Sequence, residues 1–183
     1  LLDLLVSGPL AEAAFWACGP AADFLSVKPV CKDGRISAGS PWHQDRPYWG
    51  GAVPKWSLWI AIDAATPANG CLRVVPGSHR HLRAHAASAE GRFANRVVLT
   101  PEEAAAIIDV PCAAGDVIVF HDLLLHASHP HSAGGPRRSL IPTYRDGSVP
   151  DGSRIWAQPL PLRGRPQPLA AFTAAPSASM AAT

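Results

Sequence analysis

No run of about 18 consecutive apolar residues occurs in this 183-residue chain, so the sequence offers no candidate for a membrane-spanning helix. A basic segment followed by an apolar stretch and a cleavage site, the pattern of a secretory signal, is also missing from its start. We therefore expect a cytoplasmic protein with no membrane partner. The chain does not begin with methionine and its first letters, LLDLL, enter an apolar pattern midway, so we expect that an N-terminal part is missing.

Clusters of cysteine and runs of basic residues are absent as well. The four cysteines are far apart and form no C-x-x-C pair, which argues against a zinc ribbon or a disulfide framework and favours free or buried thiols. The formal net charge is only +2, and without a basic run there is no electrostatic footprint for nucleic acid. We expect a small-molecule substrate as the partner, and the composition leaves the oligomeric state open.

Short apolar runs separated by turn residues predict a mainly β fold, an antiparallel sandwich or barrel with a few short helices. A chain of this length can bury about two thirds of its unfolded surface as one domain. The expected strands are residues 23–30, near a sheet edge because of Pro29, and residues 56–62, 71–75, 117–120 and 137–144.

The remaining segments complete the expected organisation. Thr100, followed by proline and two glutamates, has the composition of a capped helix start, and a short helix to about residue 108 should follow. Residues 80–95 have no clear period and are expected to form a surface excursion. We place the folded domain at residues 1–146. Residues 147–183, rich in Pro and Ala, should form a tail that is poorly ordered or draped over the domain.

The segment SPWHQDRPYWG at residues 40–50 carries the main chemical signal. In an extended strand the side chains of residues i and i+2 leave the same face, so His43 and Asp45 should point into one pocket. Non-haem Fe(II) oxygenases hold iron with two His and one carboxylate and leave positions open for a co-substrate and O₂. His126, which follows three leucines at the end of a predicted strand, is the candidate third ligand, although such a histidine could equally belong to the core.

His-x-Asp is a weak motif on its own, and its context adds the specificity. Three stretches occur in one order: WHQDxxYW at residues 42–49, LWIAIDxATPxNGCLxVVPGSH at residues 58–79 and GDxxxFHxLLxHxS at residues 115–128. Together they resemble the phytanoyl-CoA dioxygenase family over residues 28–144. The resemblance implies a double-stranded β-helix, or cupin-like jelly roll, that binds Fe(II) and 2-oxoglutarate. It would use O₂ to hydroxylate an aliphatic carbon of a small organic or acyl substrate, with release of succinate and CO₂.

The resemblance also implies roles for particular residues. His43, Asp45 and His126 would be the catalytic metal ligands, and Arg137 would anchor the far carboxylate of 2-oxoglutarate. Because neighbouring side chains in a strand face opposite ways, only one of Arg137 and Arg138 can enter the pocket.

Four further residues match family positions near the co-substrate, and each has a competing interpretation. Gln44 should face away from the metal if strand alternation holds, yet its family position lies near the co-substrate. Trp59 lies in an apolar strand and could be core. Ser128 could hydrogen-bond the co-substrate or only the backbone. Lys28 matches a family position beside the co-substrate pocket.

Outside this set, Tyr48 and Trp49 are candidates for the wall of the substrate mouth. Two His-x-His pairs, formed by His79 with His81 and by His129 with His131, could be read as zinc or cupin ligands. Their loop contexts favour surface histidines instead.

Two other functions remain open at the sequence level. A halogenase on the same scaffold would need the carboxylate ligand to be vacated for chloride, and Asp45 is present, which favours hydroxylation. A non-catalytic metal-binding β-barrel module would keep the shape without turnover. The substrate itself is not identified by the sequence, because specificity on such folds lies in variable loops.

Overall fold

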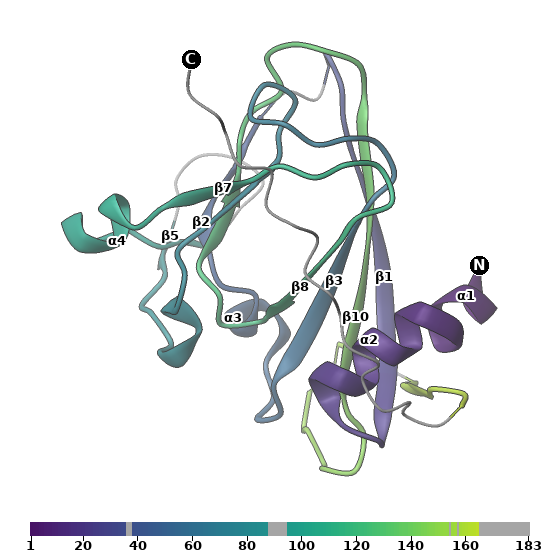
Figure 1. Ribbon diagram of the computed structural model, residues 1–183. Coiled ribbons are helices and arrows are strands. Elements are labelled where there is room, and N and C mark those ends of the chain that lie inside the picture. The colour runs from purple at the N-terminus through teal and green to yellow at the C-terminus, as the bar shows by residue number, and fades with distance from the viewer. Residues whose placement is uncertain (36–37, 88–94, 154, 157, 165–183) are drawn as a thin grey trace, which may run out of the picture.

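A computed structural model describes residues 1–35, 38–87, 95–153, 155–156 and 158–164 of the chain. Two antiparallel sheets face each other, and the helices lie on the outside (Figure 1). This arrangement confirms the predicted mainly β, jelly-roll fold. No helix in the described part of the chain has both the length and the apolar character needed to cross a membrane.

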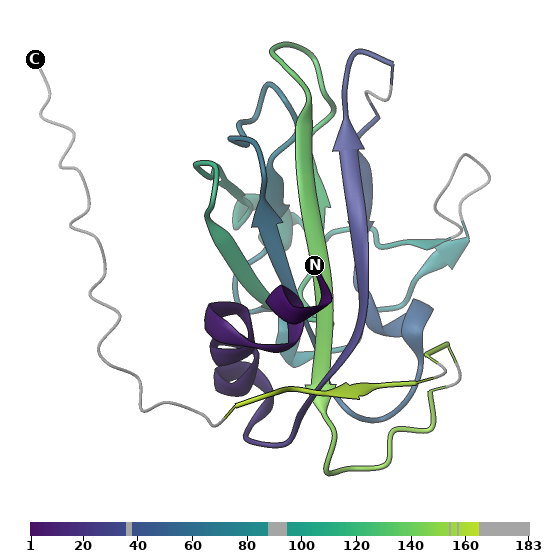
Figure 2. The ribbon, with the colours of Figure 1, turned by 90° about the vertical axis from the view of Figure 1, so that its right-hand side faces the viewer.

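The larger sheet has five strands in the order β11-β1-β10-β3-β8. Their bounds are Ala22–Lys32 for β1, Lys55–Ala61 for β3, Val117–His121 for β8, Arg137–Asp146 for β10 and Leu160–Pro161 for β11. The two longest strands, β1 and β10, run side by side and antiparallel (Figure 2). Only Asp23 and Phe24 of β1 pair with β11, so Pro29 lies on an open stretch of the sheet edge, as its missing N–H requires.

The outer face of this sheet is covered by α1 (Leu2–Val6) and α2 (Gly8–Cys18), as Figure 2 shows. Alternation along the strands sends Leu58, Phe24 and Tyr144 outward into a core cluster with both helices. The Tyr144 hydroxyl donates to the carbonyl of Leu5 at 2.8 Å, and burying each large side chain contributes about 1.5 to 3 kcal/mol. The opposite, inward face is left free to line a cavity.

The smaller sheet has the strand order β2-β9-β4-β7, and β5 and β6 form a separate pair. The bounds are Ser40–His43 for β2, Leu72–Val74 for β4, Ala86–Ala87 for β5, Asn95–Arg96 for β6, Ile108–Val110 for β7 and His126–Ser128 for β9. The short helices are α3 (Arg46–Trp49), η1 (Ser78–Arg80) and α4 (Pro101–Ala105).

Two sequence expectations need correction, and the structure adds detail to a third. The helix begins with the predicted Thr100 capping box but ends at Ala105, because residues Ile108–Val110 pair with β4 as β7. His126 does not end the strand that precedes it. It begins β9 in the other sheet, after a turn that follows His121. The excursion at residues 80–95 includes β5 and the first residue of β6, while its residues 88–94 lie outside the described chain.

The described part of the segment after Asp146 contacts the domain at several points. Asp151 is buried, β11 pairs with β1, and Leu162 packs against the cluster under the helices. Residues 165–183 of the expected tail lie outside the described residues. All four cysteines are free thiols, as the sequence predicted.

Candidate active site

His43, Asp45 and His126 meet at one end of the space between the two sheets. Each offers a ligand atom within 4.8 Å of the other two. His43 Nε2 lies 3.7 Å from Asp45 Oδ1, and His126 Nε2 lies 4.0 Å from Asp45 Oδ2. Strand pairing produces this meeting, because His43 on β2 is the direct cross-strand partner of His126 on β9. The sequence-predicted triad is therefore brought together, and it is the one such group among the described residues.

Both imidazoles present the correct nitrogen for a metal. His43 Nδ1 lies 2.8 Å from the carbonyl of Pro41, and His126 Nδ1 lies 2.9 Å from the carbonyl of Leu124. A carbonyl can only accept, so each Nδ1 carries the proton and each Nε2 keeps a lone pair that points toward the carboxylate. Burial lowers the pKa of His43 to about 3 and that of His126 to about 4, so both rings are neutral near pH 7 and fit a divalent cation.

Asp45 lies just before α3, and hydrogen bonds to the Asp122 carbonyl fix its backbone. Its N–H donates to the carbonyl of Asp122 at 2.8 Å, and the N–H of Arg46 donates to the same carbonyl at 3.1 Å. The Asp122 carboxylate, fully buried, accepts from Arg46 Nε at 2.6 Å and from its second terminal nitrogen at 2.9 Å. Asp122 precedes His126 by four residues, so it connects the segment that carries Asp45 to the segment that carries His126.

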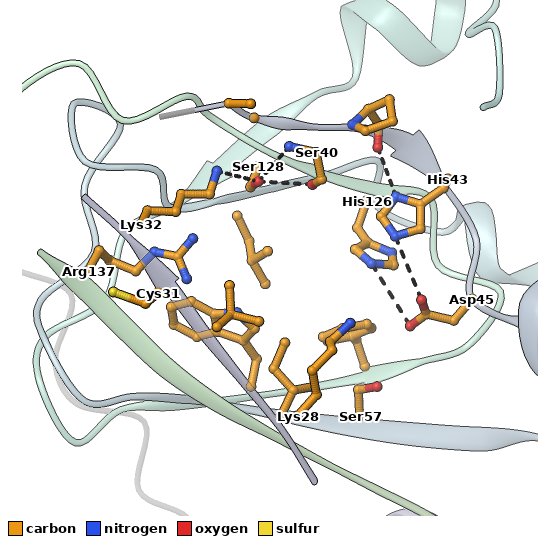
Figure 3. Close-up of a pocket in the computed structure, with 18 of the residues that line it drawn as sticks. Lys28, Cys31, Lys32, Ser40, His43, Asp45, Ser57, His126, Ser128 and Arg137 are labelled. Carbon is orange, nitrogen blue, oxygen red and sulfur yellow. Dashed lines mark hydrogen bonds and ion pairs between the residues drawn. The ribbon is translucent and has the colours of Figure 1, made fainter. Parts of the chain in front are cut away.

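A cavity of about 1000 Å³ extends from the triad between the sheets. Figure 3 shows the triad at one end and Arg137 with Lys32 at the opposite end. Arg137 is 1% exposed, and its Nε has no hydrogen-bond partner. Its terminal nitrogen donates to Ser139 Oγ at 3.0 Å, and its guanidinium carbon lies 5.2 Å from the centre of the Trp59 ring. A buried cation without an acidic partner among the described residues fits an anionic ligand.

The neighbouring arginine faces the other way, as strand alternation predicts. Arg138 is exposed and holds Asp63 through two side-chain hydrogen bonds of 2.7 Å each. Of these two neighbours, only Arg137 lines the cavity. The predicted register of this strand is confirmed.

Lys28, Trp59 and Ser128 also line the cavity. Lys28 lies on the inner face of β1, toward the triad, and its charge lowers the pKa values of both triad histidines. Ser128 Oγ accepts from the N–H of Ser40 at 3.0 Å and lies 2.9 Å from Ser40 Oγ. All three therefore occupy places from which they could contact a bound ligand.

Gln44 is not in the cavity. Its side chain is fully buried on the other side of the strand, where its amide nitrogen donates to the carbonyls of His81 and Leu123 and its oxygen accepts from the N–H of Arg83. These bonds use the amide to tie two loops together. Alternation holds at this strand end, and the structure places Gln44 away from the expected co-substrate contact.

The residues considered for the mouth and the His-x-His pairs have mixed outcomes. Trp49 lines the cavity, and the Tyr48 ring stands edge-on to His43 at 6.1 Å. His79 and His81 are exposed, as expected for surface histidines. His131 is buried with its Nε2 3.0 Å from the carbonyl of Gly135, so the surface prediction is wrong for this residue.

Lys32 and Ser57 are among the cavity residues that sequence reasoning missed. Lys32 is four residues beyond Lys28, so strand alternation places both on the same face, and this signal was available. Ser57 lines the cavity and its buried hydroxyl has no hydrogen-bond partner. The period of two in β3 places it on the same face as Trp59, but no motif marks it.

Comparison with known proteins agrees with this site. The family model described as phytanoyl-CoA dioxygenase (PhyH) matches residues 10–139. Dioxygenase lolE1 of Epichloe uncinata is 36% identical over 111 residues, which cover 60% of this chain and 41% of that protein. Methylphosphonate hydroxylase of Gimesia maris is 32% identical over 105 residues, which cover 56% of this chain and 37% of that protein. The chain thus spans about two fifths of the length of these relatives.

Solved structures show the same fold. The non-heme monooxygenase ThoJ in its apo form has a TM-score of 0.74 at 26% identity, and the match covers 88% of this chain and 61% of that one. EvdO2 of Micromonospora carbonacea var. aurantiaca, complexed with 2-oxoglutarate, has a TM-score of 0.68 at 23% identity over 90% of this chain and 66% of that one. Because the family model matches well over half of the residues, the chain belongs to the phytanoyl-CoA dioxygenase family of the Fe(II)/2-oxoglutarate oxygenase superfamily.

Proposed function

We propose that this chain carries the catalytic centre of an Fe(II)- and 2-oxoglutarate-dependent dioxygenase that hydroxylates an aliphatic carbon of a small organic or acyl substrate. In the net reaction, substrate, O₂ and 2-oxoglutarate give hydroxylated substrate, succinate and CO₂. One observation carries the proposal. Two neutral histidines and one carboxylate lie at one end of a cavity, and a buried guanidinium without an acidic partner among the described residues lies at the other end.

The residues present fit the two groups that this reaction requires. His43, Asp45 and His126 would hold iron through two Nε2 atoms and a carboxylate oxygen, a donor set typical of non-haem Fe(II). Arg137 would receive the far carboxylate of 2-oxoglutarate, since a planar guanidinium can donate two parallel hydrogen bonds to it. When bound, iron with 2-oxoglutarate and O₂ supplies the oxidising power for hydroxylation.

The contribution of the chain is to bind, orient and exclude water. Carbonyls of Pro41 and Leu124 fix the two imidazole tautomers before any ligand arrives. The Trp59 ring lies within cation–π distance of the Arg137 guanidinium and helps to hold it in place. Lys28 places a positive charge near the triad, where it would favour a carboxylate bound beside the metal.

Anaerobic titration of the protein with Fe(II) and then with 2-oxoglutarate tests the proposal. We expect a weak visible charge-transfer band that saturates at one equivalent of each, because only a chelated 2-oxo acid on Fe(II) gives this band. Iron binding without the band would support a non-catalytic metal-binding module instead. The presence of Asp45 in the triad disfavours a halogenase, which would need that ligand position for chloride.

Substrate identity needs a separate experiment. A succinate-release screen across acyl thioesters, small amino-acid-derived solutes and secondary metabolites should give one class that couples turnover to 2-oxoglutarate consumption. The chain spans about two fifths of its relatives' length, so its substrate is tested directly and not carried over from them.

A further inference from the structure

One buried hydroxyl in the cavity has no hydrogen-bond partner among the described residues. Ser57 on β3 is 1% exposed and lines the cavity, and its Oγ is unpaired. Figure 3 shows Ser57 near the triad end of the cavity, away from Arg137. A buried hydroxyl without a partner is unfavourable in the folded state. A ligand that supplies a hydrogen bond at this point would remove that penalty.

Strand pairing extends this single group into a row of hydroxyls. Ser57 is the direct cross-strand partner of Thr143 on β10, and Thr143 is the direct partner of Ser26 on β1. Direct partners in an antiparallel sheet share a face and lie about 5 Å apart at Cβ. All three residues line the cavity. Ser26, Thr143 and Ser57 therefore form a hydroxyl row across three adjacent strands.

The hydroxyl row adjoins the triad. On its other side Ser57 pairs directly with Phe120 of β8, and the centre of the Phe120 ring lies 4.9 Å from the centre of the His126 ring. One aromatic ring thus separates the end of the row from a metal-ligand candidate. A substrate whose reacting carbon lies beside the triad would place its neighbouring atoms over the row.

The 2-oxo acid leaves this part of the cavity free. Arg137 and Thr143 belong to the same strand and are six residues apart, which corresponds to about 20 Å along β10. A five-carbon acid that is held by Arg137 and reaches the triad is too short to cover the hydroxyl row as well. The row is therefore available to the primary substrate.

We infer that the hydroxyl row recognises oxygen atoms of the primary substrate, with Ser57 as the residue that determines this specificity, and that the substrate is a small oxygenated molecule. The inference rests on the proposed function and narrows its substrate class. A hydroxyl both donates and accepts, so the row suits the hydroxyl or carbonyl oxygen of a neutral polar group. A hydrocarbon chain lying there would leave Ser57 Oγ unpaired. The competing structural role is that the row only holds water.

The test uses two matched pairs of probes. The first pair is myo-inositol and cyclohexanol, and the second is the 3-hydroxybutanoyl and butanoyl thioesters of N-acetylcysteamine. Within each pair the carbon skeleton is the same and only the number of oxygen atoms differs. Binding is measured without oxygen as the change in the visible band of the protein loaded with Fe(II) and 2-oxoglutarate, and turnover is measured in air as succinate release.

For the wild type we expect the oxygen-rich member of at least one pair to bind at least about tenfold more tightly than its partner. Ser57→Ala should weaken binding of that member at least about tenfold and leave binding of its partner nearly unchanged, because only the oxygen-rich probe loses a hydrogen bond. Ser57→Thr keeps a hydroxyl and should keep the preference. Ser148→Ala, which removes a serine hydroxyl bonded to Asp146 outside the cavity, should change neither affinity.

Thermal unfolding of the metal-free proteins gives a readout that is independent of binding and turnover. Because Ser57 Oγ is unpaired in the free protein, Ser57→Ala should have a Tm equal to or above that of the wild type. A Tm lowered by several degrees would show that the hydroxyl has a structural partner and would overturn the inference.

Two further outcomes separate the inference from the proposed function. If the charge-transfer band forms but the wild type prefers the oxygen-poor probes, binds both members of each pair equally or responds to none of the four, the inference is overturned and the proposed function stands. The same holds if Ser57→Ala keeps the full preference, as expected of a row that only holds water. Absence of the band in the wild type would overturn the proposed function, and the inference with it.

Discussion

Each metal-ligand candidate lies on the cavity wall and outside the three apolar core clusters. Replacing His43, Asp45 or His126 by Ala should therefore abolish stoichiometric Fe(II) binding while changing Tm by only a few degrees, because the ligands contribute donor atoms rather than core packing. Metal content after anaerobic loading and desalting measures the first effect, and thermal unfolding of the metal-free protein measures the second.

The control for this series is His79→Ala, which removes an exposed histidine from outside the triad. Its iron content should equal that of the wild type. Retention of one equivalent of Fe(II) by Asp45→Ala would show that the triad is not the metal site.

Arg137 and Arg138 give the sharpest contrast between neighbours. We expect Arg137→Lys to weaken 2-oxoglutarate binding at least about tenfold, because a lysine offers a point charge where the planar fork makes two parallel bonds, and losing a buried charge-assisted pair costs about 2 to 5 kcal/mol. Arg138→Ala should have little effect, because that side chain pairs with Asp63 outside the cavity. Titration of each iron-loaded variant with 2-oxoglutarate measures the two affinities. A larger loss of affinity in Arg138→Ala than in Arg137→Lys would refute the assignment of Arg137 as the anchor.

At the scale of elements, the position of the Asp45 ligand depends on how the start of α3 is held. The Asp122 carboxylate holds the Arg46 side chain, its carbonyl holds the N–H groups of Asp45 and Arg46, and a carboxylate oxygen also accepts from the N–H of Lys55 at 3.0 Å. One buried residue therefore joins the start of α3, the start of β3 and the turn that leads to His126.

Asp122→Asn should lower the free energy of unfolding by on the order of 3 to 5 kcal/mol, because it breaks a buried ion pair and leaves Arg46 without its counter-charge. Fe(II) affinity should fall as well, because Arg46, the residue after the Asp45 ligand, loses its ion pair, although the backbone bonds to the Asp122 carbonyl remain. Denaturant unfolding and metal titration measure the two effects.

Asp63→Asn is a matched control for this change. It breaks the same kind of two-bonded Arg–Asp pair on the surface, where ion pairs contribute little. Its unfolding midpoint and iron affinity should stay close to those of the wild type. Equal effects of the two substitutions would show that Asp122 has no particular role at the site.

Local rules explain which elements could be predicted from the sequence. Alternation in a strand separates Arg137 from Arg138 and sets Gln44 apart from His43, so both facings follow from neighbouring residues. The start of β9 at His126 could not be predicted, because the chain changes sheets there and the pairing with His43 joins residues far apart in sequence. Alternation also places Lys32 on the same face as Lys28. The pairing of Lys32 with Arg137 could not be predicted in this way, because it joins residues far apart in sequence.

At the scale of the whole molecule, the C-terminal segment belongs to the support of the site. Asp151 accepts from Lys55 Nζ at 2.7 Å and from the N–H of Val53 at 2.9 Å, and Ser153 Oγ donates to the carbonyl of Trp49 at 2.8 Å. Trp156 packs against the same Trp49, which lines the cavity. We therefore propose that the folded unit extends beyond Asp146 to about Gly164.

Two truncations test this extension. Removing residues 165–183 should change Tm little, because their Pro/Ala-rich sequence has no periodic apolar face to bury. Ending the chain at Asp146 should instead be severely destabilising, since the fully buried Lys55 ammonium would lose the carboxylate partner that it has among the described residues. Breaking such a pair costs about 3 to 5 kcal/mol.

Asp151→Asn in the full chain separates this charge effect from the loss of the segment itself. It should reproduce most of the loss of stability, and Lys55→Met combined with Asp151→Leu should recover much of it, because a buried ion pair can be replaced by apolar residues of similar size at little cost. Thermal unfolding compares the full chain, the chain ending at Asp146, Asp151→Asn and the double variant. If the chain ending at Asp146 had the same Tm as the full chain, the domain would end where the Pro/Ala-rich composition begins. Pairing of Lys55 with Asp151 would then not be needed for stability.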